Sequence, residues 1–248
     1  LDNLQTINNI RLWDDRPLSD VYRQIQLIRP YYDFKGADVD RYTIDGEYRQ
    51  VLLSAREVAP DRLEPETQTW INQKLVYTHG IGIAMSPVTE FTPEGRPIFF
   101  AKDIPSNGVI PVSVEDAVGE PDLMVDNPRI YYGENTTDYI VANSNTEELD
   151  YQTTEGELIR TKYSGTGGVP LSSYFRKLAY AWEMADINIL ISGEITSESL
   201  IQYRRSIQER ISTIAPFLKL DEDPYIVIAE GKLFWIQDAY TITDKYPY

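Results

Sequence analysis

The sequence predicts an α+β fold in which antiparallel-rich mixed sheets pack against helices. Strand-like runs and helical patterns occur in clusters, without the regular strand–helix–strand alternation of a parallel α/β fold. Two dipeptides that favour tight turns, Asp45-Gly46 and Glu230-Gly231, each separate two strand-like runs. The 248 residues suffice for a large core. We therefore expect either one domain or two lobes.

The N-terminal part of the chain predicts a helix followed by a hairpin. The helix is expected over residues 17–29, because apolar residues recur there at spacings of four and three before Pro30. Alternating residues on both sides of the Asp-Gly turn predict a hairpin over 39–57, since both turn residues tolerate positive φ.

A second helix is expected to begin near Pro65 and to run through Leu75, because proline suits the first turn of a helix. Gly80 would end this helix in the left-handed conformation. His79 would then lie beside the negative end of the helix dipole. A strand is expected to follow over residues 81–86.

Residues 105–128 have the composition of an extended connector. They hold four prolines and an Asn-Gly pair, which disfavour a packed element. We therefore place an internal boundary here, between a lobe over 1–104 and a lobe over 129–248.

The second half of the chain predicts strands, two helices and a closing hairpin. The first helix spans Leu171 to Trp182, with apolar residues along one face. The second begins near Ser197 and ends at Pro216. The strands are expected at 130–132, 139–141 and 158–163, the inward residues of the second helix are Leu200, Tyr203, Ile207, Ile211 and Ile214, and the hairpin covers 225–240.

The charge and composition exclude several classes of function. The chain has 23 Lys and Arg against 39 Asp and Glu, a formal net charge of −16, which disfavours nucleic acid as a partner. No apolar run approaches the roughly 20 residues that cross a bilayer, so these residues by themselves are expected to be soluble. The absence of cysteine excludes disulfides, thiolate nucleophiles and Cys-ligated metals.

His79 is the only histidine, which excludes two-histidine zinc motifs. A Ser-His-Asp triad would require this residue, but no Gly-x-Ser-x-Gly motif supplies a nucleophile. We favour a histidine at a helix end over a catalytic one.

Gly165, Gly167 and Gly168 lie between an expected strand and an expected helix. Free backbone N–H groups there could hold a phosphate or carboxylate. The segment lacks both the P-loop and the dinucleotide-binding patterns, so a tight structural connection is favoured.

Acidic clusters occur at 14–15, among Asp33, Asp38, Asp40 and Asp45, and at 221–223. Their carboxylates could ligate calcium, although none matches the Asp-x-Asp-x-Asp-Gly pattern. Solvated acidic loops are the favoured interpretation. No other metal and no cofactor are expected.

Tyrosine outnumbers phenylalanine by 18 to 7, which suits an interface whose rings pack while their hydroxyls stay wet. Ordinary sheet-face tyrosines explain the excess equally well. Arg204, Arg205 and Arg210 could grip an acidic partner. Because Arg205 and Glu209 are four residues apart, a helix ion pair between them is favoured instead.

Several phrases together resemble the uncharacterised protein family numbered one hundred and eighty-two, found in bacteria and cyanobacteria. They follow one another along nearly the whole chain: Arg11-Leu12-Trp13-Asp14, Arg16-Pro17-Leu18, Gln26 to Tyr32 (QLIRPYY), Asp40-Arg41-Tyr42, Gln50 to Arg56 (QVLLSAR), Leu75 to Gly80 (LVYTHG), Ile130 to Glu134 (IYYGE), Gly167 to Leu171 (GGVPL), Ala215 to Leu218 (APFL) and Asp238 to Tyr248 (DAYTITDKYPY). At Gln152-Thr153-Thr154 the family more often shows proline.

The resemblance implies a larger protein of the cell membrane, with several transmembrane helices in its N-terminal part. A long extracytoplasmic region follows, of which this chain is similar to the first portion. The family has no established activity or catalytic residues to carry over.

Two functional hypotheses follow. The first is a non-catalytic extracytoplasmic binding or assembly module, whose partners are the membrane-embedded segments of the same protein and an envelope protein or polysaccharide. The second is a hydrolase of envelope carbohydrate that uses paired carboxylates from Asp14, Asp15, Asp40 and Asp45. The candidate ligand-binding residues are Trp13, Asp14, Arg16, Tyr42, His79, Gly165, Gly167 and Gly168.

Overall fold

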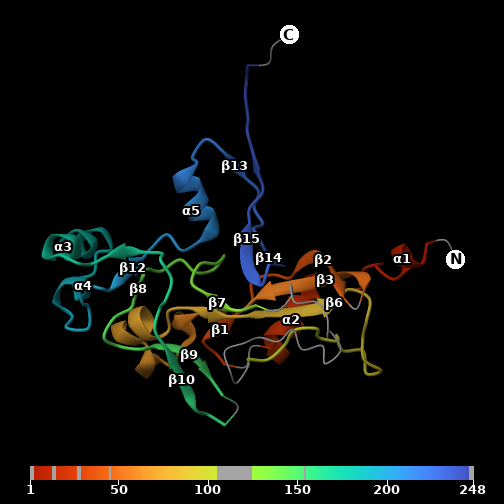
Figure 1. Cartoon of the computed structure of the whole chain (residues 1–248), viewed down its shortest axis with the longest axis horizontal. Helices are drawn as coiled ribbons and strands as arrows, with labels where there is room; N and C mark the ends of the chain where they lie inside the picture. Colours follow the sequence, from red (N-terminus) through yellow and green to blue (C-terminus); the bar gives the residue numbers. More distant parts are fainter. Residues whose placement is uncertain are drawn as a thin grey trace.

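The computed structural model describes residues 3–12, 15–26, 29–44, 46–104, 125–153 and 155–245. Its sheets are small and antiparallel, and helices pack beside them (Figure 1), which confirms the α+β prediction. The helical elements are α1 (Leu4–Ile7), α2 (Asp15–Gln26), η1 (Pro60–Arg62), η2 (Pro65–Thr67), η3 (Asn72–Val76), α3 (Tyr174–Glu183), α4 (Asn188–Ile191) and α5 (Ile207–Ile214).

The strands pair in seven small sheets within the described residues. They are β1 (Tyr32–Asp33) with β4 (Glu57–Val58); β2 (Asp38–Ile44), β3 (Glu47–Ala55) and β6 (Ile83–Pro87); β5 (Gly80–Ile81) with β7 (Arg129–Ile130); β9 (Glu148–Gln152) with β10 (Leu158–Thr161); β11 (Val169–Pro170), β12 (Leu200–Gln202) and β8 (Ile140–Ala142); β13 (Lys219–Leu220) with β16 (Ala239–Tyr240); and β14 (Tyr225–Ala229) with β15 (Lys232–Ile236).

Both predicted hairpins form. In β2–β3, Ile44 pairs with Glu47 across the turn, and Gly46 has φ 74°. In β14–β15, Glu230 and Gly231 have φ 51° and 69°, the two positive values that a tight hairpin turn requires. Local turn chemistry therefore determines both elements.

Two of the core clusters are built from different elements, which lie apart in Figure 1. One joins β3, β6, β7 and β14 through residues such as Leu53, Met85 and Ile226. The other lies beneath α3, α4, β8 and β12 and includes Val141 and Ile201. The two-lobe arrangement stays a prediction, and residues 105–124 of the proposed boundary lie outside the described residues.

The helix expected from Pro65 is wrong in extent. A 3-10 turn and a short π-helix replace it, because polar side chains bind the local backbone: the Asn72 side chain donates to Thr67 O and the Asn72 N–H donates to Thr69 Oγ1. Gly80 is a strand residue paired with Ile130, so it does not end a helix in the left-handed conformation.

The helix expected from Ser197 is also wrong at its start. Leu200–Gln202 forms β12, which pairs with β8 on one edge and β11 on the other. This pairing overrides the helical spacing of Leu200 and Tyr203. The helix α5 begins at Ile207, and its last residue, Ile214, is exposed.

The expected helix over 171–182 is present as α3, but its apolar face is open. Phe175 and Trp182 are 79% and 86% exposed. Ile187 and Ile191, beside and within α4, are exposed too. Only the narrow side that carries Ala181 is buried against the core. We call the surface of Tyr174, Phe175, Leu178, Trp182, Ile187 and Ile191 the α3–α4 surface.

Candidate functional site

A buried polar cluster surrounds His79. Its Nδ1 lies 2.8 Å from Thr78 Oγ1 and 3.3 Å from Glu148 Oε2. Its Nε2 lies 3.3 Å from Asp150 Oδ1. The ring stacks on Tyr131, with 4.7 Å between the centroids. His79 therefore does not sit at a helix end, as the sequence had predicted, but at the centre of this cluster.

Three strands position these side chains. Glu148 and Asp150 are two residues apart on β9, so they point to the same face, while Leu149 between them packs into an apolar cluster. The pairing of β5 with β7 places His79 next to Tyr131. This pairing depends on a close approach between the backbones of Gly80 and Arg56. A Cβ at Gly80 would lie 2.1 Å from the Arg56 carbonyl oxygen.

Arg205 cross-links the loops of the cluster through hydrogen bonds to their backbone. It is 2% exposed, and its guanidinium donates to the carbonyl oxygens of Tyr131 at 2.7 Å and Thr78 at 2.5 Å. Burial lowers the pKa of Arg205 to about 10. The expected helix ion pair of Arg205 with Glu209 is wrong, because Arg205 precedes α5 and points inward; Arg204 approaches Glu209 instead, at 3.9 Å.

Both carboxylates of the cluster are held in the ionised form. Burial raises the pKa of Glu148, but hydrogen bonds from His79, Thr78 and Tyr131 lower it by more. The net pKa of Glu148 is therefore below its ordinary value. Burial likewise raises the pKa of Asp150, and His79 together with a two-bond contact from Arg129, at 2.8 and 2.7 Å, brings it below the ordinary value.

Tyr131 separates this cluster from an open pocket. Burial, and then the negative charge of Glu148, raise the pKa of its phenol, which keeps the hydroxyl protonated. Its hydroxyl donates to Glu148 Oε2 at 2.6 Å. The ring meets Tyr163 edge-on, with 4.8 Å between centroids. Tyr131 therefore forms the floor of the pocket above it.

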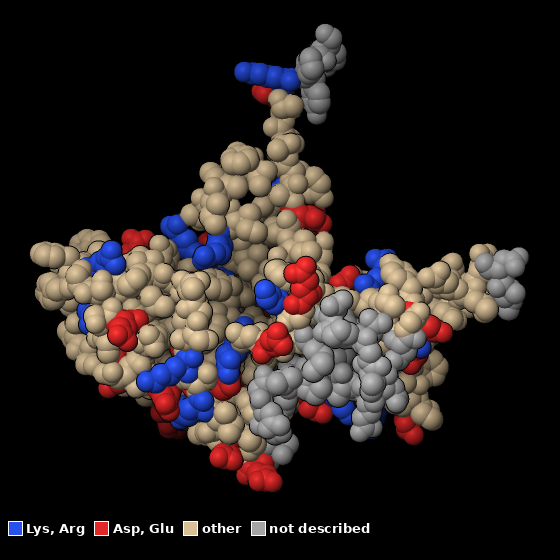
Figure 2. Space-filling view, in the orientation of Figure 1, with Lys and Arg blue, Asp and Glu red and all other residues tan. Residues whose placement is uncertain are grey.

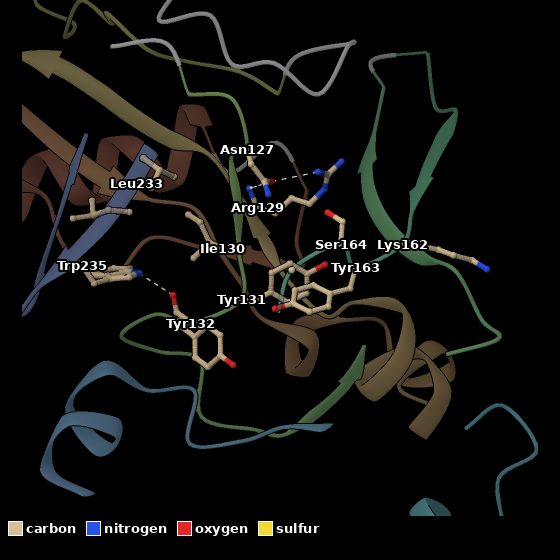
Figure 3. Close-up of a pocket in the computed structure, with 12 residues that line it drawn as sticks. Asn127, Arg129, Ile130, Tyr131, Tyr132, Lys162, Tyr163, Ser164, Leu233 and Trp235 are labelled. Carbon is tan, nitrogen blue, oxygen red and sulfur yellow. Dashed lines mark hydrogen bonds between the residues drawn. The ribbon is translucent and has the colours of Figure 1, made fainter. Parts of the chain in front are cut away.

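The pocket has a volume of about 290 Å³ and an aromatic lining (Figure 3). We call it the aromatic pocket. Trp235 on β15 donates its indole N–H to Tyr132 O at 2.8 Å, which fixes the ring at the wall. Lys162 points away from the other lining side chains. The other lining residues are Asn127, Arg129, Ile130, Tyr131, Tyr132, Tyr163, Ser164, Gly165, Ile226, Leu233 and Trp235.

Two of the candidate residues that were chosen from the sequence lie at this pocket. Gly165 lines it, and His79 lies beneath its floor. Gly167 donates its N–H to the Tyr163 hydroxyl at 2.9 Å, and Gly168 has φ 109° with little space for a Cβ. The glycine segment thus wraps closely around an aromatic wall of the pocket.

The other sequence-selected residues do not meet there. Tyr42 lies on β2, where its hydroxyl accepts the N–H of Ile228, and it does not line the pocket. Trp13, Asp14 and Asp45 lie outside the described residues, as do the side chains of Asp15 and Arg16. The hydrolase pairing of carboxylates stays a prediction.

Sequence reasoning missed most of the site. Glu148 and Asp150 carried a usable signal, since acidic residues alternate there with Leu149 and Tyr151 in a strand-like pattern. Nothing local indicates that this strand approaches His79 or that Trp235 approaches Tyr132. Those contacts depend on pairing between distant segments.

The acidic clusters do not assemble a metal centre in the part of the chain that the structure describes. Asp33 accepts a hydrogen bond from Arg62 at 2.7 Å, and Arg23 lies 3.4 Å from it. Calcium binding stays a prediction. Among the described helices, none combines the length and the apolar character needed to cross a bilayer.

Comparisons with known proteins place the chain in a family. The model of an uncharacterised protein family (UPF0182) matches residues 1–248. The chain is 51% identical over 247 residues to a UPF0182 protein of Trichodesmium erythraeum, with all of this chain and 26% of that relative covered. It is 48% identical over 246 residues to one of Pelotomaculum thermopropionicum, covering 99% of this chain and 26% of that protein.

A UPF0182 protein of Synechococcus is 47% identical over 246 residues, which cover 99% of this chain and 28% of that relative. The chain thus spans about a quarter of the length of these curated relatives. No solved structure matches it. The match over the whole chain confirms the resemblance seen in the sequence, and the chain belongs to the uncharacterised protein family UPF0182.

Proposed function

We propose that this chain is a non-catalytic binding module whose aromatic pocket takes one unit of a saccharide. The observation that carries the proposal is the lining, in which Tyr131, Tyr163 and Trp235 come from three separate segments and surround one open space. Sugar rings present C–H faces that pack on aromatic rings, and a few polar groups fix their orientation. Asn127 and Ser164 supply such groups in this pocket.

The polar cluster below the pocket favours binding over catalysis. A general acid at neutral pH needs a raised carboxyl pKa, whereas Glu148 and Asp150 have lowered ones. The His79 side chain is fully buried, so a ligand in the pocket meets Tyr131 before it meets the imidazole. The cluster therefore holds the floor of the pocket rigid.

The test is isothermal titration calorimetry with soluble neutral oligosaccharides, namely the trimers of N-acetylglucosamine and of glucose. We expect one of them to bind, and we expect Ser164→Trp, which fills the pocket from an exposed position, to weaken binding at least tenfold. Trp182→Ala removes an exposed tryptophan on α3 and serves as the control. If no saccharide binds, or if Ser164→Trp and Trp182→Ala behave alike, the proposal fails.

The proposal also places the module in the extracytoplasmic part of a longer membrane protein, as the family resemblance implied. The chain contains no cysteine, so one cysteine can report on this region if any others in the full-length protein are first replaced. Glu155→Cys lies in an exposed turn. A membrane-impermeant maleimide should label it in intact cells. Labelling that requires permeabilised cells would contradict the placement.

For the assembly part of the proposal, the α3–α4 surface packs against another part of the full-length protein. This chain accounts for about 26% of its relatives' length, so most of the longer protein is available to cover that surface. In the isolated chain, maleimide should label Trp182→Cys and Glu155→Cys equally. In the full-length protein, Trp182→Cys should be protected and Glu155→Cys should not. Equal labelling in both contexts would contradict this contact.

A further inference from the structure

A second, basic pocket shares Tyr132 with the aromatic pocket. It has a volume of about 250 Å³, and Tyr132 lines both pockets. We call it the arginine pocket. Two arginines line it, and neither Asp nor Glu does, in a chain whose formal net charge is −16. Its polar and aromatic lining consists of Tyr132, Gln202, Tyr203, Arg204, Arg210 and Thr213.

The two arginines are weakly compensated by protein carboxylates. Arg204 has one carboxylate neighbour, Glu209, at 3.9 Å, the outer limit of an ion pair. No carboxylate of the described residues lies within ion-pair distance of Arg210, whose guanidinium stands 4.6 Å from the centre of the Tyr132 ring. In Figure 2, basic side chains gather at the foot of α5, the helix that carries Arg210. Planar guanidinium groups of this kind match oxyanions such as carboxylates and phosphates.

The neighbouring aromatic pocket restricts the kind of oxyanion. Tyr132 lines both pockets, so a ligand that spans them needs a ring for the aromatic side chains and a negative charge for the arginines. A bare oxyanion has no such ring. A sugar that carries an oxyanion has both.

We infer that the arginine pocket binds the acidic group of an anionic saccharide, one unit along from the sugar held in the aromatic pocket. The inference rests on the proposed function and specifies its ligand class. Tyr132 lines both pockets, so one saccharide that spans them contacts this residue in each.

The test compares a galacturonic acid trimer, a glucose phosphate and the neutral trimers by calorimetry. We expect the trimer of uronic acid to bind at least tenfold more tightly than the neutral trimers, and a preference for the sugar phosphate instead would assign a phosphorylated sugar. Arg210→Gln should remove the preference for the acidic ligand and leave the neutral affinity unchanged. Arg176→Gln, which removes an exposed arginine on α3, is the charge-matched control.

The outcomes separate the two proposals. Binding of neutral and acidic ligands with equal affinity overturns this inference and leaves the aromatic pocket standing. A preference that persists in both Arg204→Gln and Arg210→Gln, or that Arg176→Gln also abolishes, overturns it too. If no saccharide of either kind binds, both proposals fail. Thermal melts of each variant show whether a loss of binding is a loss of folding.

Discussion

Replacement of Gly80 by alanine tests how the site is held in place. An ideal Cβ at this position would lie 2.1 Å from the Arg56 carbonyl oxygen and 2.7 Å from Glu57 Cα. Unstrained carbon–oxygen contacts begin at about 3.3 Å, so the two backbones would have to separate by about 1 Å. That separation weakens two hydrogen bonds, from Ile81 N to Arg56 O at 3.0 Å and from Arg56 N to Gly82 O at 2.9 Å.

The expected loss follows from these contacts. Overpacking of a tight site costs about 1–3 kcal/mol, and each weakened backbone bond adds about 1 kcal/mol. We therefore expect Gly80→Ala to lower the free energy of unfolding by about 3–5 kcal/mol. For a chain of this size the melting temperature should fall by about 10 °C.

Urea unfolding and thermal melts followed by circular dichroism measure both quantities. Gly36→Ala is the matched control, because no atom lies within 4 Å of its Cβ position and its φ is not left-handed. It should change the free energy of unfolding by about 0.5 kcal/mol or less. If the two alanine variants have the same stability, the close approach of β5 to Arg56 is refuted.

Three further predictions concern the polar cluster. Arg205→Met leaves three carbonyl oxygens without their buried donor and should lower the free energy of unfolding by about 3–5 kcal/mol in urea. The control, Arg204→Met, should lower it by about 0.5 kcal/mol or less. Because the folded-state pKa values of Glu148 and Asp150 are lowered, their contribution to stability is complete above the ordinary carboxyl pKa of about 4 and is lost as the pH falls through the lowered values. Tyr131→Phe removes the hydroxyl that donates to Glu148 and should cost about 1.5–3 kcal/mol, with saccharide binding retained because the ring remains.

Each of these has a contrary result. Equal stability of the Arg205 and Arg204 variants would show that the buried guanidinium is not a cross-link. If Glu148→Gln with Asp150→Asn leaves the acid unfolding curve unchanged in shape, the lowered pKa values are wrong. Loss of binding in Tyr131→Phe, without loss of folding, would mean that the phenol itself contacts the ligand.

The parts of the fold that the sequence predicts are those with local causes. The turn at Glu230-Gly231 is one, because the two positive φ values belong to the turn residues themselves. The strand at Leu200–Gln202 is the opposite case: its helical spacing is a local feature, but pairing with β8 and β11 decides its conformation.

The candidate site was unpredictable for the same reason. His79 contacts Tyr131 and Asp150, which follow it by more than fifty residues in the chain, and these contacts depend on the β5–β7 pairing. The sequence identifies Gly165 as a loop glycine and a candidate ligand-binding residue. Its position beside Tyr163 and the aromatic pocket depends on tertiary structure. The sequence shows which residues have reactive or hydrogen-bonding side chains, but it does not show which of them lie next to one another in the fold.

The most direct test of the proposed binding function is nuclear magnetic resonance mapping of the backbone amides and tryptophan indoles during titration with the saccharide trimers. The proposed binding function predicts that the Trp235 indole N–H and the Gly165 amide shift together in a saturable way, since both residues line the aromatic pocket, while the Trp182 indole on α3 stays unchanged. Shifts confined to Trp182 and its neighbours, or no shifts at all, would contradict it.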